Sequence, residues 1–323
     1  MATAEQIKSL VMSHFSDNAE RFYTIALQVA AHEASQGHGA VAHDIRHIID
    51  KSRKQKCRRP SPFVGDLSHL ILSDEPQIPI ASLVLPKDLK QRIERVLHEY
   101  KQQHKLKLHG LTHRRKILLV GPPGTGKTMS AKVLAHELHL TLHTIQVDKL
   151  VTKFMGETSA KLRQIFDLIQ QKEGVYLFDE FDAIGGERSL DNDVGEMRRV
   201  LNAFLQFIEQ DQSDSLIVAA TNSPKLLDRA LFRRFDDVLY YKDPAPELRN
   251  VLMKNVLASF LPENFALDQF VKKSAGLSHA EIDYACRDAI KQAILSDKQY
   301  VNATQLKKML KERNNALQGK VDC

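Results

Sequence analysis

The first fifty residues have apolar side chains at helical spacing. They recur every three or four positions, which places each set on one face of a helix: Ile7, Leu10, Val11 and Phe15 form the first set, and Phe22, Ile25, Ala26 and Val29 form the second. Gly37 and Gly39 interrupt the pattern before another such segment at Val41–Ile49. We therefore predict that residues 1–50 form a small helical bundle, a docking domain rather than a catalytic one.

A basic, proline-containing stretch follows this segment. The run KSRKQKCRR (Lys51–Arg59) precedes Pro60 and Pro62, and we assign residues 51–80 to a linker. The same run could instead be an electrostatic docking patch, and the sequence leaves both interpretations open. A long amphipathic helix is expected from Lys87 to Leu108, ending near Gly110.

Short apolar runs then alternate with helical stretches. The expected strands are Lys116–Val120, Leu142–Val147, Val175–Phe178, Leu216–Ala220 and Val238–Tyr241. Alternation of this kind predicts an α/β domain, a parallel sheet covered by helices on both faces, over residues 81–243. Residues 244–323 have no further strand pattern and are expected to form a small all-helical domain, with breaks at Gly276 and Asn302.

Composition and charge narrow the class of protein. The chain is 43% hydrophobic and 27% charged, which is typical of a globular protein. No run approaches the roughly 18 apolar residues of a membrane helix, and the start has no secretory signal, so we expect a cytoplasmic protein without a membrane partner. Three widely spaced cysteines argue against a disulfide framework. A net charge of +6 permits a nucleic-acid partner without requiring one.

The strongest motif is a glycine-rich loop between a strand and a helix. GPPGTGKT follows the strand Lys116–Val120 and precedes a helical segment, which is the context that a phosphate-binding loop requires. Its backbone N–H groups and the helix N-terminus attract phosphate oxygens. Lys127 is expected to reach the β- and γ-phosphates, and Thr128 to bind Mg²⁺. The predicted nucleotide contacts are Gly121, Pro122, Pro123, Gly124, Thr125, Gly126, Lys127, Thr128 and Met129. A chance glycine loop is the alternative.

Polar residues follow two of the later strands. Asp179 and Glu180 follow the apolar run Val175–Phe178, and Asn222 follows Leu216–Ala220. In α/β sheets ligands bind at the carboxyl ends of the strands. Asp179 therefore suits Mg²⁺, Glu180 is placed to take a proton from an attacking water, and Asn222 can orient that water. Asn222 could alternatively be a simple turn residue before Pro224.

Taken together, these segments resemble the AAA family of ATPases, within the AAA+ superfamily, over about residues 80–300. The motifs are GPPGTGKT, VYLFDEFDAIGGER, LIVAATNSPKLLDRALFRRFDD and GLSHAEID. The resemblance implies ATP and Mg²⁺ as ligands, a homo-oligomeric and typically hexameric ring, and remodelling of protein substrates. It matches Asn222 to the sensor position. It also matches Arg233 and Arg234 to paired arginines at the subunit boundary, with Arg234 the better candidate for the finger. Surface pairing of these arginines with Asp236 and Asp237 is the alternative.

The same resemblance assigns two further segments. Gly276 and Ala280 match the turn and helix of the lid that approaches the nucleotide. Phe154, Met155 and Gly156 match a pore loop, before a helix expected at Thr158–Gln171. Phenylalanine and methionine can grip an extended peptide without reading its sequence, because their contacts are apolar and adaptable. Outside a ring, Phe154 would more simply be a core residue.

The sequence is therefore compatible with three functions. The first is an ATPase ring that pulls on polypeptide, with an adaptor or a separately encoded protease docking on residues 1–50. The second is a nucleic-acid motor or loader, motivated by the basic charge, although we see no aromatic and basic interleaving of the kind that stacks bases. The third is a nucleotide-gated switch that recruits a partner through residues 1–50.

Overall fold

The computed structural model describes residues 67, 69–150, 155–184, 193–223, 232–263 and 265–317, together with Ala26, Val29 and Ala30. The chain divides into two units, Met1–Phe63 and Val64–Cys323. Ala26, Val29 and Ala30 are buried, but the rest of the expected N-terminal bundle and the basic run lie outside the described residues. No helix within the described segments has the length and apolar composition needed to cross a lipid bilayer.

The second unit is built around one six-stranded sheet. Its strands are β1 (Ile71–Asp74), β2 (Lys116–Val120), β3 (Leu142–Gln146), β4 (Val175–Asp179), β5 (Leu216–Thr221) and β6 (Asp237–Tyr240). They lie in the order β1-β3-β4-β5-β2-β6. Every neighbouring pair from β3 to β6 is parallel, and β1 pairs with β3 antiparallel. The predicted α/β fold is therefore confirmed, with the expected parallel pairing from β3 to β6 and one additional antiparallel strand, β1.

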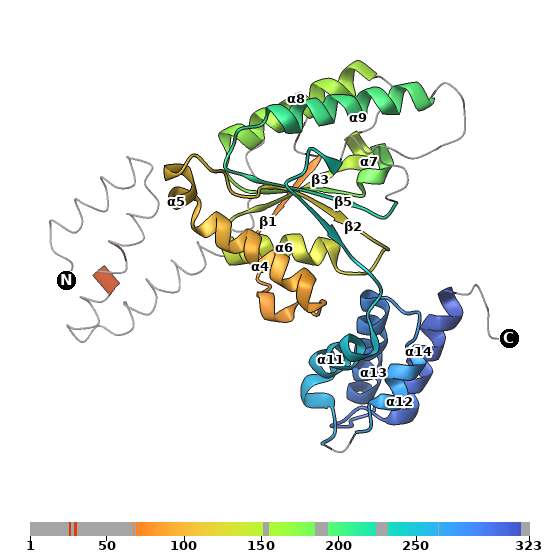
Figure 1. Cartoon of the computed structure of the whole chain (residues 1–323). Helices are drawn as coiled ribbons and strands as arrows, with labels where there is room; N and C mark the ends of the chain where they lie inside the picture. Colours follow the sequence, from red (N-terminus) through yellow and green to blue (C-terminus); the bar gives the residue numbers. More distant parts are fainter. Residues whose placement is uncertain are drawn as a thin grey trace. The chain divides into compact units, whose positions relative to one another are not determined.

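Helices cover both faces of this sheet (Figure 1). The first part of the unit contains η1 (Ile80–Ser82), α4 (Lys87–Lys101), α5 (Gln103–Leu108), α6 (Lys127–Leu138), α7 (Val147–Leu150), α8 (Met155–Gln171), η2 (Phe181–Ile184) and α9 (Asp193–Gln210). Helices α4 and α6 lie on one face, and α8 and α9 lie side by side on the other.

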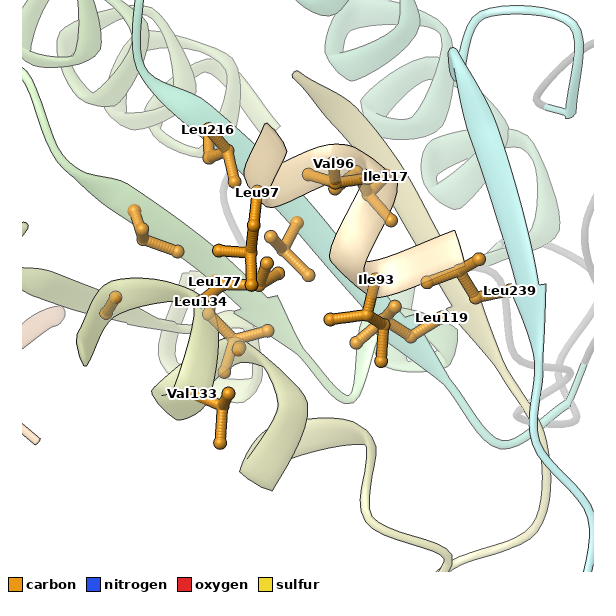
Figure 2. Packing of buried hydrophobic residues seen from close by; sticks show 14 of the residues in the cluster. Ile93, Val96, Leu97, Ile117, Leu119, Val133, Leu134, Leu177, Leu216 and Leu239 are labelled. Carbon is orange, nitrogen blue, oxygen red and sulfur yellow. The ribbon is translucent and has the colours of Figure 1, made fainter. Parts of the chain in front are cut away.

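Alternate residues of the strands supply the two cores. On the α4 and α6 face, Ile93 and Leu134 pack with strand residues such as Leu119, as Figure 2 shows. On the other face, the rings of Phe166 on α8 and Phe204 on α9 pack against Phe178 of β4. Because successive strand residues point to opposite faces, an uninterrupted apolar run such as Val175–Phe178 fills both cores.

Two details differ from the sequence prediction. The single helix expected to end at Leu108 is broken at Gln102, whose φ and ψ of −107° and 15° are not helical, so α4 and α5 are separate. Strand β1 was not predicted, because only Ile71 of its four residues is buried and the segment has no apolar alternation. It extends the sheet before residue 81, the predicted start of the α/β domain. The division into domains otherwise stays a prediction.

The last part of the unit is helical, as expected. It contains α11 (Pro246–Leu257), η4 (Ala258–Phe260), α12 (Asp268–Lys273), α13 (His279–Leu295) and α14 (Ala303–Leu317). These helices share a separate core centred on residues such as Met253, Ile282 and Leu306. Helix α13 begins with a capping box, in which Ser278 and Glu281 each bond the other's backbone N–H.

A buried histidine in β3, the strand next to the edge strand β1, makes stability depend on pH. His143 of β3 is fully buried, its Nδ1 lies 2.8 Å from the Ser73 Oγ, and its ring contacts Tyr176. Burial, and secondarily the charge of Lys172, lowers the pKa of His143 from 6.5 to about 4. The folded state therefore favours the neutral ring, and its stabilisation is complete above pH 6.5 and is lost as the pH falls towards 4.

We expect the free energy of unfolding to fall by about 2 kcal/mol from this group between pH 7.5 and pH 5.0. Urea unfolding of the wild type and of His143→Gln at both pH values measures it. The variant should be less stable at pH 7.5 but should lose less stability on acidification. His98→Gln, at an exposed position on α4, is the control. An unchanged pH dependence in His143→Gln would contradict the assignment.

Candidate functional site

The loop between β2 and α6 has the shape of an anion cradle. Gly126 is the N-cap of α6 and has a φ of +100°, and a Cβ there would meet nothing within 4 Å. The backbone angle, rather than crowding, therefore requires glycine. Since the first N–H groups of a helix have no partner within it, the start of α6 presents free donors and the positive end of its dipole to this loop.

Lys127 is buried at the centre of the site. Its Nζ donates to the carbonyl oxygens of Gly121 at 2.7 Å and Pro122 at 2.8 Å, and to the Asn222 Oδ1 at 2.7 Å. Burial lowers its pKa, while the carboxylates of Asp179 and Asp182 act in the opposite direction. The ammonium group is held against the loop, where incoming phosphate oxygens can replace carbonyl acceptors.

Thr128 and Asp179 form a pair of oxygen groups beside Lys127. The Thr128 Oγ1 donates to the Asp179 Oδ2 at 2.9 Å. Mg²⁺ is usually bound by one or two protein oxygens together with substrate phosphates and water. A hydroxyl and a carboxylate in contact fit that requirement. The described residues contain no group of three or more histidine, cysteine, aspartate or glutamate side chains that could hold a metal by themselves.

Glu180 directly follows this pair at an unusual backbone angle. Its φ is +52°, it is exposed, and its N–H donates to the Asp179 Oδ1 at 3.0 Å. A positive φ in a non-glycine residue is uncommon and is often found in functional sites. In the neighbouring loop, the Asn222 N–H donates to the Asp182 Oδ1 at 3.2 Å. The structure thus brings the ends of β4 and β5 to the same place as Lys127.

The helical domain contacts the same loop. The N–H of Ala280, in the first turn of α13, donates to the carbonyl of Gly124 at 3.0 Å. Gly276 lies in the turn before this helix and has a φ of +83°. Of the two predicted lid residues, Ala280 therefore contacts the loop directly, and Gly276 belongs to the turn that leads to it.

The two candidate finger arginines lie outside this cluster of contacts. The Arg234 Nε pairs with the Glu209 Oε2 at 3.0 Å, and Arg233 is exposed. The aspartates named in the alternative interpretation have other partners: Asp236 accepts from the N–H groups of Arg115 and Lys116, and Asp237 pairs with Arg92.

The predicted pore loop is described only in part. Phe154 lies outside the described residues. Met155 and Gly156 form the start of α8, which begins three residues before the expected Thr158. The assignment of these three residues to a pore stays a prediction.

Sequence reasoning missed several residues of the site. Asp182 was within a quoted motif but had no assigned role, and its carboxylate holds the Asn222 backbone. Ser130 and Tyr241 were not singled out, although the Tyr241 Oη donates to the Oγ of Ser130, in the helix that follows the loop, at 2.8 Å. A tyrosine at the end of an apolar strand and a serine in a helix carry no local signal of this contact.

Known proteins resemble this chain over its central part and, in one case, over nearly its full length. Residues 117–243 match the family described as ATPases associated with various cellular activities (AAA). An uncharacterised AAA family ATPase of Sinorhizobium fredii is 30% identical over 97% of this chain and 96% of its own length. A protein of Methanothermobacter thermautotrophicus, named as a candidate 26S proteasome regulatory subunit homologue, is 33% identical over 62% of this chain and 55% of its own. A similarly named protein of Methanocaldococcus jannaschii is 32% identical over 66% and 60%, respectively. The chain thus spans little more than half of the length of these last two relatives.

Proposed function

On the premise that this chain belongs to the AAA family and is an ATP-hydrolysing enzyme, we propose that it works as a Mg²⁺-dependent ring that remodels protein substrates. One observation carries the assignment of the nucleotide site. Lys127, Thr128, Asp179 and Asn222 come from three different segments and meet through hydrogen bonds of 2.7 to 2.9 Å at the mouth of the glycine-rich loop.

Each group has a role that its position supports. The loop from Gly121 to Met129 wraps the phosphates, and Lys127 binds the β- and γ-phosphoryl oxygens. Asn222, fixed by Lys127 on its side chain and by Asp182 on its backbone, orients the attacking water. Glu180 accepts the proton from that water. Because Glu180 is exposed, it can reach a water on the open side of the γ-phosphate.

The proposed site also requires a metal ion to neutralise the charge of the phosphates. Thr128 and Asp179 would hold Mg²⁺, with Asp179 acting through water. When bound, the ion would neutralise charge on the phosphoryl oxygens. Gly276 and Ala280 bring the start of α13 against the loop, so that the helical domain closes over the bound nucleotide.

The ring supplies the last cation. We assign to Arg234, supported by Arg233, the stabilisation of transition-state charge in the pocket of a neighbouring subunit. The relatives named as candidate proteasome regulatory subunit homologues support an assembly that handles proteins. In such a ring, Phe154 and Met155 grip polypeptide in the central channel, and Gly156 lets their loop tilt. Residues 1–50 dock an adaptor or a separate protease.

Replacing Phe154 tests the substrate side of this proposal. With casein as an unfolded probe, the ratio of casein-stimulated to basal ATP turnover should fall to about one in Phe154→Ala, because the apolar grip is lost. Phe154→Tyr keeps an aromatic ring and should keep most of the stimulation. Because a grip of this kind does not read sequence, a wild-type enzyme that ignores casein would argue against threading, as would full stimulation of Phe154→Ala.

A further inference from the structure

A buried tyrosine connects the segment before the helical domain to the phosphate loop. Tyr241 follows β6 directly, is 3% exposed, and donates its Oη proton to the Ser130 Oγ at 2.8 Å. Ser130 is fully buried in the second turn of α6. Burial raises the pKa of Tyr241 far above its usual value, so the phenol stays protonated and remains a donor.

Ser130 in turn contacts the peptide group between Gly126 and Lys127, at the start of α6. Its Oγ donates to the Gly126 carbonyl at 3.0 Å, and its N–H donates to the same oxygen at 2.9 Å. In a planar trans peptide the N–H points opposite to the C=O. Holding the Gly126 carbonyl inside the helix therefore directs the Lys127 N–H outward, to the place where phosphate oxygens bind.

The backbone of Tyr241 holds the other end of the loop. Its N–H donates to the Val120 carbonyl at 2.7 Å. A Cβ on Gly121 would lie 2.4 Å from the Tyr241 carbonyl oxygen, so only glycine allows this approach. One residue thus fixes where the loop starts, at Val120 and Gly121, and where it ends, at Gly126.

We propose that Tyr241 is a positioning residue for nucleotide binding, which acts through the Ser130 hydroxyl on the Gly126–Lys127 peptide and ties its orientation to the segment leading into the helical domain. Residues 242–245 are all that separates Tyr241 from α11. A shift of that segment when the helical domain moves is then transmitted to a phosphate donor. This inference rests on the proposed nucleotide site.

Four variants test the hydrogen bonds from Tyr241 through Ser130 to Gly126. They are Tyr241→Phe, Ser130→Ala, their combination, and Tyr176→Phe as a matched control. Tyr176 is also fully buried and donates its hydroxyl to a backbone carbonyl, that of Lys172 at 2.8 Å, but it lies in β4 away from the loop. The measurements are the affinity for Mg-ADP by calorimetry, the KM and kcat for ATP, and the melting temperature.

We expect Tyr241→Phe to weaken Mg-ADP binding by about 3- to 10-fold, the effect of one lost hydrogen bond, and to raise KM more than it changes kcat. Ser130→Ala should weaken binding at least as much. The double variant should bind no more weakly than Ser130→Ala alone, because the phenol acts only through the serine. Tyr176→Phe should lower the melting temperature without changing the affinity. If Ser130→Ala does not fold, Tyr241→Phe against Tyr176→Phe still decides the question.

Two results would overturn the proposal. Tyr241→Phe could bind Mg-ADP as tightly as the wild type while melting lower, which would make the contact merely structural. The two single effects could instead add fully, which would mean that the hydroxyls act separately. Lys127→Ala, measured alongside, separates this failure from that of the site: undiminished Mg-ADP binding by Lys127→Ala would remove the proposed phosphate site itself.

Discussion

Glu180→Gln is expected to lower the kcat for ATP by about 10²- to 10⁴-fold, because the amide cannot take a proton from the attacking water. This is the range that general-base catalysis contributes. The affinity for Mg-ATP should stay within about threefold of the wild type. The substitution keeps the size of the side chain and leaves the backbone bond from Glu180 to Asp179 undisturbed. Single-turnover hydrolysis and equilibrium binding of Mg-ATP measure the two effects separately.

The control is Glu94→Gln, an identical exchange at an exposed position of α4, which should hydrolyse ATP at the wild-type rate. Hydrolysis by Glu180→Gln within tenfold of the wild type would exclude Glu180 as the general base. Loss of Mg-ATP binding would show instead that the carboxylate has a structural role at the positive-φ turn. The binding measurement is therefore as informative as the rate.

Arg234→Ala is expected to lower kcat by about 10³-fold or more, the range for NTPases that use an arginine finger. The sharper test mixes this variant with Glu180→Gln. A subunit with Arg234→Ala keeps its own Glu180, and a Glu180→Gln neighbour donates an intact Arg234. In a head-to-tail ring, an equal and random mixture should complete about a quarter of the pockets, so activity should appear that neither variant has alone.

The double variant Glu180→Gln/Arg234→Ala is the matched control. Mixed with Arg234→Ala it supplies no finger, and mixed with Glu180→Gln it supplies no base, so neither mixture should recover activity. If the mixture of the two single variants is as inactive as its components, although the subunits co-assemble, the finger does not act across a subunit boundary. Undiminished activity of Arg234→Ala alone would remove the role entirely.

The ion pair between Arg234 and Glu209 does not oppose this role. The pair with Glu209 is partly exposed on the arginine side and largely exposed on the glutamate side, at 33% and 65%. Such surface pairs contribute about 0 to 1 kcal/mol. Exchanging Glu209 for a phosphate of the neighbouring subunit therefore costs little compared with the rate effect expected from the finger.

The sheet was predictable because its signal is local. Runs such as Lys116–Val120 and Val175–Phe178 are apolar on both sides of the strand, and each is followed by turn or site residues. Parallel pairing then brings their carboxyl ends together, which is how Lys127 and Asp179 could be placed in one site from the sequence alone. The strand β1 lacks that signal, since its pairing with β3 is decided by backbone groups and one buried side chain.

The rest of the site depends on contacts between distant segments. Ser130 and Tyr241 are 111 residues apart, and Arg234 and Glu209 are 25 residues apart. Each of these side chains looks ordinary in its own window of sequence. Hydrophobic periodicity and motif spacing describe neighbours along the chain, so they cannot reveal a partner that only the folded backbone brings near.

The hydrogen bond between Ala280 and Gly124 has a consequence for how the helical domain can tilt. Both groups belong to the backbone, so every side-chain substitution except proline at Ala280 leaves them in place. When α13 moves away from the loop, the Ala280 N–H and the Gly124 carbonyl both lose their hydrogen-bond partner and must bind water instead. If the helical domain tilts during nucleotide exchange, as proposed, water molecules have to enter as α13 leaves the loop and depart as it returns, and the hydration of this one backbone contact then becomes part of each cycle.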